Sequence, residues 1–469
     1  MKLSCSWSRV LLPILAFAVS ACTVGPGYQR PRVAMPAAWV APRPHAGDGD
    51  QMIGWWGRFG DPVLTQLQAL AEKNSPTLDQ AVARIDLARA NLASSRAQGL
   101  PSLSGSFSDT EAGQHVTGTA QAILLTQTGA QVSGDASWEL DLFGKIRRGN
   151  QAAKARIVAR FDDWHDARVS LAAEVADDYV QYRGCEQLAD LYRQQSLSQG
   201  ETARLTRISA NAGFTAPADA ELAEASAASV RSTYTDQAAQ CDVLVKSLTS
   251  LAGQEEAPLR AILAGGKRAL PMPAGFEVAS VPADLLRQRP DVASSERELA
   301  ATSAEIGVAV AALYPSLTLS GSISTGGGIT QWSFGPSLSL PIFDGKARAG
   351  VRSARASYAL QLATYRRTVR SAMLEVEQTL VRLESARARE SDAERSAAGY
   401  EANFLAIDRL RQIGSTSMIE RENAWRNALD ARHSLVNLRI DQIRQWIALY
   451  KALGGGWGAV SSTIGEHDQ

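Results

Sequence analysis

Two cysteines in the middle of the chain have the spacing of a disulfide bridge. Cys185 precedes Gly213 by the same number of residues by which Cys241 follows it. Gly213 belongs to the stretch AGFTAP, a turn signal between two long helical stretches. In an antiparallel helix pair, residues equidistant from the turn face each other, and a disulfide needs Cα atoms about 4.4–6.8 Å apart. The spacing therefore predicts a Cys185–Cys241 disulfide, and the alternative is two buried thiols.

The N-terminus contains a cysteine with a different chemistry, the attachment of lipid. Lys2 and Arg9 flank the start of the apolar stretch LLPILAFAV, which is too short to span a bilayer. The next residues, Val19–Cys22 (VSAC), resemble the lipobox of bacterial lipoproteins, in which the cysteine becomes the acylated first residue. The alternative is an ordinary signal peptide with a cysteine near its cleavage point. Because Thr23 follows instead of aspartate, the usual signal for retention in the inner membrane is missing.

No set of residues has the spacing of a catalytic or metal centre. The five histidines are scattered and lack the spacing of metal ligands. The glycine-rich stretches Gly326–Thr330 and Gly454–Trp457 lack the strand–helix context of a nucleotide-binding loop. The chain has 48 basic and 48 acidic residues, which argues against a nucleic-acid binder. We therefore predict that the protein is not an enzyme, holds no cofactor or metal and does not bind nucleic acid.

An internal repeat organises the chain. Three glycine pairs share one constant offset in the numbering, whereas the upstream prolines Pro101 and Pro315 correspond at a larger offset. The first copy therefore has about 13 extra residues between its strands. The constant register of the glycines indicates a duplicated structural unit. The glycine pairs are Gly144 with Gly345, Gly213 with Gly414, and Gly253 with Gly454.

Each copy repeats the same order of predicted elements. A lead-in helix ends at a proline corner, and two segments follow in which apolar and Ser/Thr residues alternate, as in strands. Trp138 and Trp332 lie on the apolar sides of these segments. Segments of about 10 residues with this pattern are typical of outer-membrane strands, and the alternative is a half-buried hairpin on a soluble domain. A proline-free helix of about 100 Å and a shorter returning helix come next.

Four membrane strands constrain the assembly of the chain. Small barrels need about eight strands, and open sheet edges are not tolerated in lipid. We therefore predict that the chain assembles with copies of itself around a symmetry axis. Two copies would supply eight strands and three would supply twelve, and strand counting does not choose between them.

Several motifs, in their order and spacing, resemble the outer membrane factors. These are the TolC-type channels, and within them the chain resembles the NodT-like lipoprotein subgroup of resistance-nodulation-division efflux systems. The motifs are GWWGRFGDPVL (Gly54–Leu64), SWELDLFGKIRR (Ser137–Arg148), VPADLLRQRPDVASSERELAAT (Val281–Thr302), YPSLTLSGS and LPIFDGKARAG.

The resemblance implies an α+β membrane protein that forms a homotrimer. Four β-strands per chain would complete a 12-stranded outer-membrane β-barrel on top of a long periplasmic α-helical barrel. It also implies a passive exit duct of a tripartite efflux pump, which exports small molecules such as drugs. The partners would be a periplasmic adaptor (membrane fusion) protein, an inner-membrane pump and outer-membrane lipid. The alternatives are a duct for type I protein secretion and a lipid-anchored periplasmic scaffold that does not span the membrane.

The repeat and the resemblance together predict a domain organisation. Gly144 and Gly345 mark the predicted exits from the strands into the long helices. The first repeat has strands near 101–109 and 131–142 and helices at 145–211 and 218–251, and the second has strands near 316–324 and 331–342 and helices at 346–412 and 418–453. The predicted domains are a signal peptide (1–21), a lipid-anchored segment (22–60), the first repeat (61–253), an equatorial linker (254–283), the second repeat (284–454) and a C-terminal tail (455–469).

The resemblance assigns a role to the two helix–turn–helix tips as a periplasmic gate and adaptor contact. The family pattern has an acid six residues after the turn glycine, which corresponds to Asp219 and Glu420. A second acid of the pattern is replaced by Asn423, so the resemblance does not extend to a strong cation-binding constriction. The alternative role for both acids is stabilisation of helix N-termini. Three arginines flank the turns as candidates to pair with these acids or to bind the adaptor: Arg207, Arg409 and Arg411.

Overall fold

The computed structural model describes residues 23–33, 55–116, 123–273 and 289–455. The predicted signal peptide and the predicted lipidation site Cys22 lie outside these residues, as do part of the predicted linker and nearly all of the tail. The chain divides into two compact units. Unit 1 comprises Met1–Arg32, Val82–Asp162 and Ala293–Arg367, and unit 2 comprises Val33–Ala81, Asp163–Val292 and Thr368–Gln469.

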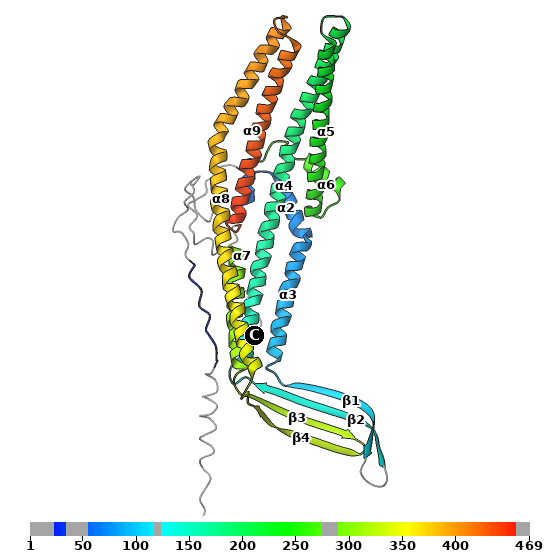
Figure 1. Ribbon diagram of the computed structural model, residues 1–469, viewed down its shortest axis with the longest axis vertical. Coiled ribbons are helices and arrows are strands. Elements are labelled where there is room, and N and C mark those ends of the chain that lie inside the picture. The colour runs from blue at the N-terminus through cyan, green and yellow to red at the C-terminus, as the bar shows by residue number, and fades with distance from the viewer. Residues whose placement is uncertain (1–22, 34–54, 117–122, 274–288, 456–469) are drawn as a thin grey trace, which may run out of the picture. The chain divides into compact units, whose positions relative to one another are not determined.

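Unit 1 contains one antiparallel sheet of four strands. The order in the sheet is β1-β2-β3-β4, so the middle pair joins the first repeat to the second (Figure 1). Strands β1 and β4 are the edges, and each has one side without a strand neighbour in the described chain. The strands are β1 (Ser102–Val116), β2 (Ile123–Leu140), β3 (Ser316–Gly326) and β4 (Ile329–Ser339).

The register of the sheet separates apolar from polar side chains. Trp138 pairs with Leu319, and Ile323 pairs with Trp332, so that large apolar residues form rows on one face. This face is exposed, with Trp332 at 75% and Leu103 at 83% of full accessibility. Serines occupy the other face, where Ser106 and Ser133 are linked by a hydroxyl–hydroxyl hydrogen bond of 2.7 Å. The sheet therefore has one apolar exposed face, as the alternation predicted.

The first hairpin is longer than the sequence predicted. Its strands β1 and β2 have 15 and 18 residues, whereas β3 and β4 have 11 each. The extra residues of the first copy extend the strands instead of forming a loop. The prediction of a strand near 101–109 was wrong at its end because Asp109–Val116 (DTEAGQHV) lacks a clear apolar alternation, yet its backbone pairs with β2 as far as Val116.

The helices of unit 1 pack through small side chains. Helix α4 (Lys145–Asn211) meets α7 (Pro290–Ala311) at a cluster of Ala152, Ala301 and Ala304. Arg156 pairs with Glu305 beside this cluster. Because alanine buries little apolar surface, this contact depends on close approach of the helices and on ion pairs at its sides.

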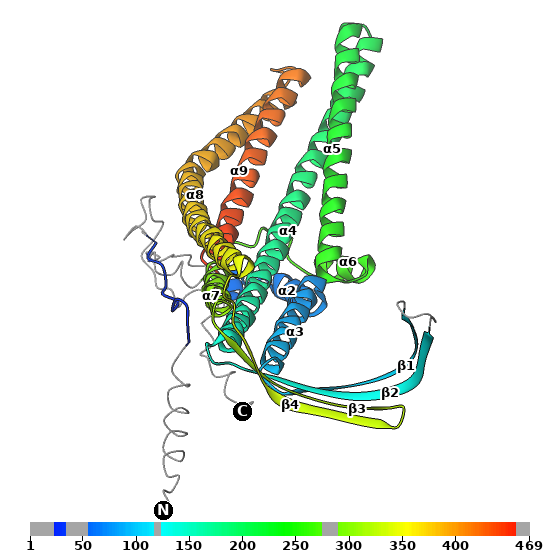
Figure 2. The same ribbon diagram turned by 60° about the horizontal axis from the view of Figure 1, so that its bottom comes forward.

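Unit 2 contains two long helical hairpins. In the first, α4 turns into α5 (Pro217–Ala252), and in the second, α8 (Gly345–Gln412) turns into α9 (Met418–Ala452). The four helices lie side by side in the order α8–α9–α4–α5 (Figure 1, Figure 2). Small clusters hold each hairpin together, such as Ala203 with Ala223 and Ala227 between α4 and α5. The predicted fold class, long helices with four antiparallel strands per chain, is confirmed.

The short helices α2 (Pro62–Asn74) and α6 (Glu256–Ala264) pack against α5, and hydrogen bonds link both to α4. Arg183 of α4 is 1% exposed and donates hydrogen bonds to the Tyr179 hydroxyl and to the Leu263 carbonyl. Tyr179 in turn donates to Asp61, whose other carboxylate oxygen caps α2. Helix α6 lies within the predicted linker at 254–283, which was expected to be irregular.

The structure joins Cys185 of α4 to Cys241 of α5. The Cα atoms are 5.5 Å apart, and the two residues are separated by 56 positions in the sequence. Cys185 is buried, whereas Cys241 is partly exposed. The disulfide therefore joins the two helices of the first hairpin far from their turn, just past the middle of α4.

We expect the double variant Cys185→Ala/Cys241→Ala to be less stable than the wild type. A bridge that closes a loop of this length contributes roughly 4 kcal/mol in the chain-entropy model. The measurement is the melting temperature in detergent by circular dichroism, together with mass spectrometry of unreduced peptides. Reduced wild-type protein should melt like the double variant. Equal melting temperatures for the oxidised wild type and the variant, or two free thiols in the peptides, would contradict the expectation.

Candidate functional site

The two predicted strand–helix junctions differ in their backbone. Gly144 has a φ of 79°, a left-handed conformation that favours glycine, and a Cβ at this position would lie 2.8 Å from the Thr23 side chain. Asp141 then accepts from the backbone N–H of Ile146 and Arg147 at the start of α4. Gly345, by contrast, is the first residue of α8 and meets no neighbour. The two junctions therefore share sequence, but only the first needs glycine.

The two hairpin tips are built alike. Gly213 has a φ of 79° and Gly414 a φ of 78°. The amide of Phe214 donates to the Ser209 carbonyl, and the amide of Ser415 donates to the Leu410 carbonyl, in the register of the glycine pairs. Both tips thus end their first helix with the six-residue hydrogen bond of a Schellman motif. The repeat extends to individual backbone hydrogen bonds.

The predicted tip acids lie in the first turns of the returning helices. Asp219 is the third residue of α5, and Glu420 is the third residue of α9. The Glu420 backbone N–H donates to the Ser417 hydroxyl over 3.1 Å, which is half of a capping box. The Glu420 carboxylate accepts a hydrogen bond from Thr416. These positions favour helix stabilisation by the acids.

The arginines that flank the tips do not pair with the predicted acids. Arg207 donates to Glu224 at 2.6 Å and to Glu221 at 2.9 Å, across the first hairpin. These hydrogen bonds raise the pKa of Arg207 and lower the pKa of Glu224. Arg411 reaches the Met418 sulfur, and Arg409 is exposed. Arg207 pairs instead with Glu221 and Glu224, which follow Asp219 along α5 by about half a turn and about one and a half turns.

A contact that the sequence reasoning missed joins the two hairpins. Helix α4 of the first repeat and α9 of the second run antiparallel, and we call their line of contact the α4–α9 seam. A Cβ on Gly184 would lie 2.2 Å from Ile440 Cδ1, so the helices approach closely there. Three polar or aromatic layers follow the seam: Asp177 with Arg444 at 2.7 Å, Tyr192 with His433 at 4.1 Å between ring centroids, and Ser198 with Glu422 at 2.9 Å.

The layer nearest the tips is a buried carboxylate network. Glu422 of α9 is buried, and its Oε2 accepts from Ser198 and from Thr202 at 3.1 Å. Its Oε1 has no hydrogen-bond partner within the described part of the chain. Arg421 donates to Ser198 and, at 2.7 Å, to Asp408 of α8. The hydrogen bonds to Glu422 offset the free-energy cost of burying its carboxylate. Together with the Arg421–Asp408 pair, they connect α4, α9 and α8.

Burial shifts the titration of two groups along the seam. It lowers the pKa of His433, whose Nε2 is buried without a hydrogen-bond partner among the described residues. At the other end of the seam, burial raises the pKa of Asp178 to about 6, and the charges of Asp177 and Glu174 add to the shift. Both groups therefore favour the neutral form in the folded protein.

We expect Asp178→Asn to raise the melting temperature at pH 8 and to change it little at pH 4. The pKa of the Asp178 carboxyl is higher in the folded protein than in the unfolded chain. The protonated carboxyl therefore stabilises the folded state fully below the unfolded pKa, and this stabilisation is lost as the pH rises through about 6. Asparagine keeps the neutral state at every pH. The measurement is thermal unfolding from pH 4 to 8.

The matched control is Asp190→Asn on the same helix. The hydrogen bond from Arg193 lowers the pKa of Asp190, so its replacement should not stabilise the protein at pH 8. A shift for Asp178→Asn that is the same at pH 4 and pH 8 would speak against the assigned titration.

The described residues contain no group of three or more His, Cys, Asp or Glu side chains placed to hold a metal ion. None of the helices in these same ranges is both long and apolar enough to cross a bilayer.

Comparison with known proteins gives a consistent result over the length of the chain. A family model described as "Outer membrane efflux protein" matches residues 67–254 and 281–455, one match in each repeat. Nodulation protein T of Rhizobium leguminosarum bv. trifolii is 30% identical over 473 residues, covering 97% of this chain and 99% of that protein.

Two further similarities concern an efflux pump protein and an outer-membrane channel. The "Solvent efflux pump outer membrane protein SrpC" of Pseudomonas putida is 30% identical over 472 residues, covering 95% of this chain and 98% of that protein. The solved structure of the outer-membrane channel OprN is similar with a TM-score of 0.79 and 29% identity, covering 93% of this chain and all of that one.

Proposed function

Because this chain belongs to the outer membrane efflux protein family, we propose that it forms the passive outer-membrane exit duct of a tripartite efflux pump. It is not an enzyme, and the energy for export comes from an inner-membrane pump reached through a periplasmic adaptor. The relative SrpC is a solvent efflux protein, which supports small apolar or amphipathic molecules as cargo over secreted proteins.

The observation that carries this function is the exposed apolar face of the four-stranded sheet. Phe334 is 76% exposed and Phe107 is 70% exposed, on the same face as Trp332. Burial in lipid would remove this surface from water, at about 25 cal/mol per Å² of apolar area. A periplasmic scaffold that never enters the membrane would leave the face in water.

The edges of the sheet support assembly into a trimer. Strands β1 and β4 present unpaired backbone groups, which must be satisfied within lipid. Pairing of β4 of one copy with β1 of the next would satisfy them, and three copies would close twelve strands around a lumen. We further propose that the two repeats, 61–253 and 284–454, form this wall and that 254–283 is the equatorial linker.

The N-terminal segment supports the lipid anchor at Cys22. Thr23, the next residue, packs on Gly144, which directly precedes α4. The Val24 amide donates to the Phe143 carbonyl, and Arg148 donates to the Val24 carbonyl. Since Cys22 is bonded directly to Thr23, an acyl chain on Cys22 would start near the strand–helix junction. That junction lies at the membrane surface if the sheet spans the bilayer.

We expect lipid on Cys22 and not merely signal cleavage. Intact mass spectrometry of the purified protein should show a mature chain that begins at Cys22 and carries added acyl mass. The Cys22→Ser variant should lack that mass and be released more easily from membranes by mild detergent, because several acyl chains at about 0.8 kcal/mol per CH₂ would be lost. A mature wild-type chain without acyl mass would refute the anchor.

The tips and the α4–α9 seam are the proposed gate and adaptor contact. The seam holds the second hairpin against the first, so widening the duct at its tips would require these polar layers to separate or shift. Glu422 and Arg421 are therefore the proposed gate residues of this chain. Asp219 and Glu420 act mainly by stabilising the helices that carry the tips.

We expect purified protein to be a trimer that forms channels in planar bilayers, and Arg421→Ala to increase its time-averaged conductance. The variant loses hydrogen bonds from a charged donor to Asp408 and Ser198. Such bonds contribute about 1.5–3 kcal/mol, which would shift a closed–open equilibrium roughly tenfold or more. The measurements are the mass of the detergent complex and single-channel current.

Arg426→Ala is the matched control, because Arg426 is exposed on the same helix and donates to Asn423. Its conductance should equal that of the wild type. Glu420→Ala and Asp219→Ala should have smaller effects than Arg421→Ala, since first-turn acids contribute about 0.3–1 kcal/mol. A stable monomer would refute the duct, whereas unchanged conductance in Arg421→Ala would refute only the gate.

A further inference from the structure

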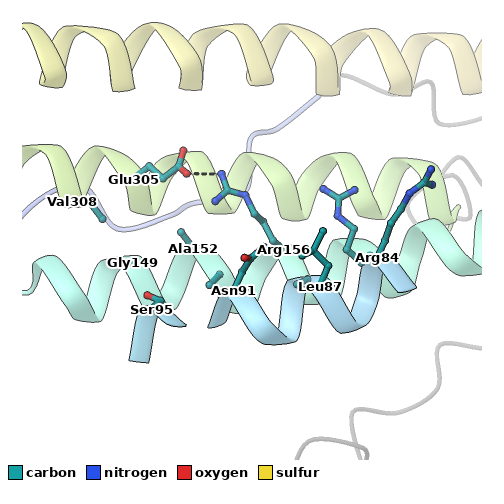
Figure 3. Close-up of a pocket in the computed structure, with 12 residues that line it drawn as sticks. Arg84, Leu87, Asn91, Ser95, Gly149, Ala152, Arg156, Glu305 and Val308 are labelled. Atoms are coloured by element: carbon teal, nitrogen blue, oxygen red, sulfur yellow. Dashed lines mark hydrogen bonds and ion pairs between the residues drawn. The ribbon is translucent and has the colours of Figure 1, made fainter. Parts of the chain in front are cut away.

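A cavity of about 560 Å³ opens in unit 1 between α3 (Pro76–Ala97), α4 and α7. This volume lies within the range of about 300–1,000 Å³ that is common for small-molecule sites. Figure 3 shows Arg84 and Leu87 of α3, Arg156 of α4 and Glu305 of α7 around it. The lining combines guanidinium groups with an apolar floor of alanine, leucine and valine.

The charges at the cavity are not balanced. Arg156 is paired with Glu305, and Arg160 is paired with Glu298. Arg84 is exposed and makes neither a hydrogen bond nor an ion pair with the residues that the structure describes. The Arg84 guanidinium therefore remains available to an anion.

The surroundings add positive potential. The first part of α4, residues 145–161, contains six basic and no acidic residues, and so does α8 over residues 345–367. These basic residues lie near helix N-termini, where the helix dipole disfavours positive charge. The dipole therefore does not account for their enrichment. Helix α7 adds Glu305 to the lining, but three arginines outnumber this one acid, and an excess of one sign of charge raises the local concentration of counter-ions. Organic anions would therefore accumulate near the cavity, whereas cations would not.

Helix α7 places the cavity on the side away from the N-terminal segment (residues 23–33). Tyr28 of this segment donates to Glu296, and Gly25 packs directly on Gly307. Glu305 follows Glu296 by nine residues, which is a rotation of about 180° around a helix with 3.6 residues per turn. A segment that leads to a lipid anchor must lie outside the ring of helices. On the proposed trimer, the cavity therefore faces the interior of the duct.

We propose that this cavity is a transit site for amphipathic organic anions. A carboxylate or sulfonate group would pair with Arg84, and the apolar body would lie against Leu87 of the same helix. The planar guanidinium fork suits both anionic groups because it donates two parallel hydrogen bonds. The proposal rests on the proposed duct function and adds a preference for one class of cargo.

The test is isothermal titration of the purified trimer, in a non-ionic detergent, with naphthalene-2-sulfonate. Wild-type protein should bind the probe, and Arg84→Ala should weaken binding at least about tenfold, because a charge-assisted pair is lost. Arg84→Lys should bind with intermediate affinity. Binding of the neutral analogue 2-naphthalenemethanol should be the same in wild type and Arg84→Ala.

Arg89→Ala is the matched control. Arg89 lies on the same helix, pairs with Asp86 and stacks over Phe161, and it does not line the cavity. Its replacement should leave probe affinity unchanged. Equal affinities of the wild type and Arg84→Ala, or equal losses in Arg84→Ala and Arg89→Ala, would overturn the site.

Current through single channels separates the two proposals. Probe added to the bath should reduce wild-type current more than Arg84→Ala current. Channels that conduct but show the same block in both proteins would reject the cavity as a transit site and leave the duct intact. Absence of any conducting wild-type trimer would reject the duct itself, whatever the titration shows.

Discussion

The unsatisfied backbone groups at the two edges of the sheet are the constraint on which this protein's architecture depends. A four-stranded sheet with an exposed apolar face is stable in lipid only when its edges are paired. The chain cannot pair them itself, because β1 and β4 are separated by β2 and β3. Repetition of the chain around an axis satisfies them, and the same operation surrounds a lumen with helices.

Helix α4 has a central position in this arrangement, and its contacts show how a thin wall is held together. It is joined to α5 by the disulfide, to α9 by the seam, to α7 by alanine contacts with ion pairs, and to the short helices by Arg183. Few of these contacts bury large apolar side chains. Close approach at small residues and specific polar pairs therefore hold α4 to its neighbours, in addition to the leucines buried elsewhere in the units.

Much of the fold could be predicted because its signals are local. Helix α4 begins at Lys145 and ends at Asn211, the range that the absence of proline and the turn glycine predicted. The contact between Cys185 and Cys241 could be predicted because both are the same number of residues from Gly213 in the sequence. The length of the first hairpin could not be read in this way, since Asp109–Val116 pairs through its backbone without an alternating pattern.

By itself, the sequence determined the duplicated unit, the two tips, the ends of the long helices and the apolar face of the sheet. Each of these depends on residues that are close together in the chain or related by a constant offset. Only the tertiary structure decided that Glu422 is buried against Ser198, that Arg207 pairs with Glu221 and Glu224 instead of Asp219, and that Arg84 shares a cavity with Arg156. Such contacts depend on which helices become neighbours and on their rotation, and no local pattern specifies that choice because packing of whole helices sets it.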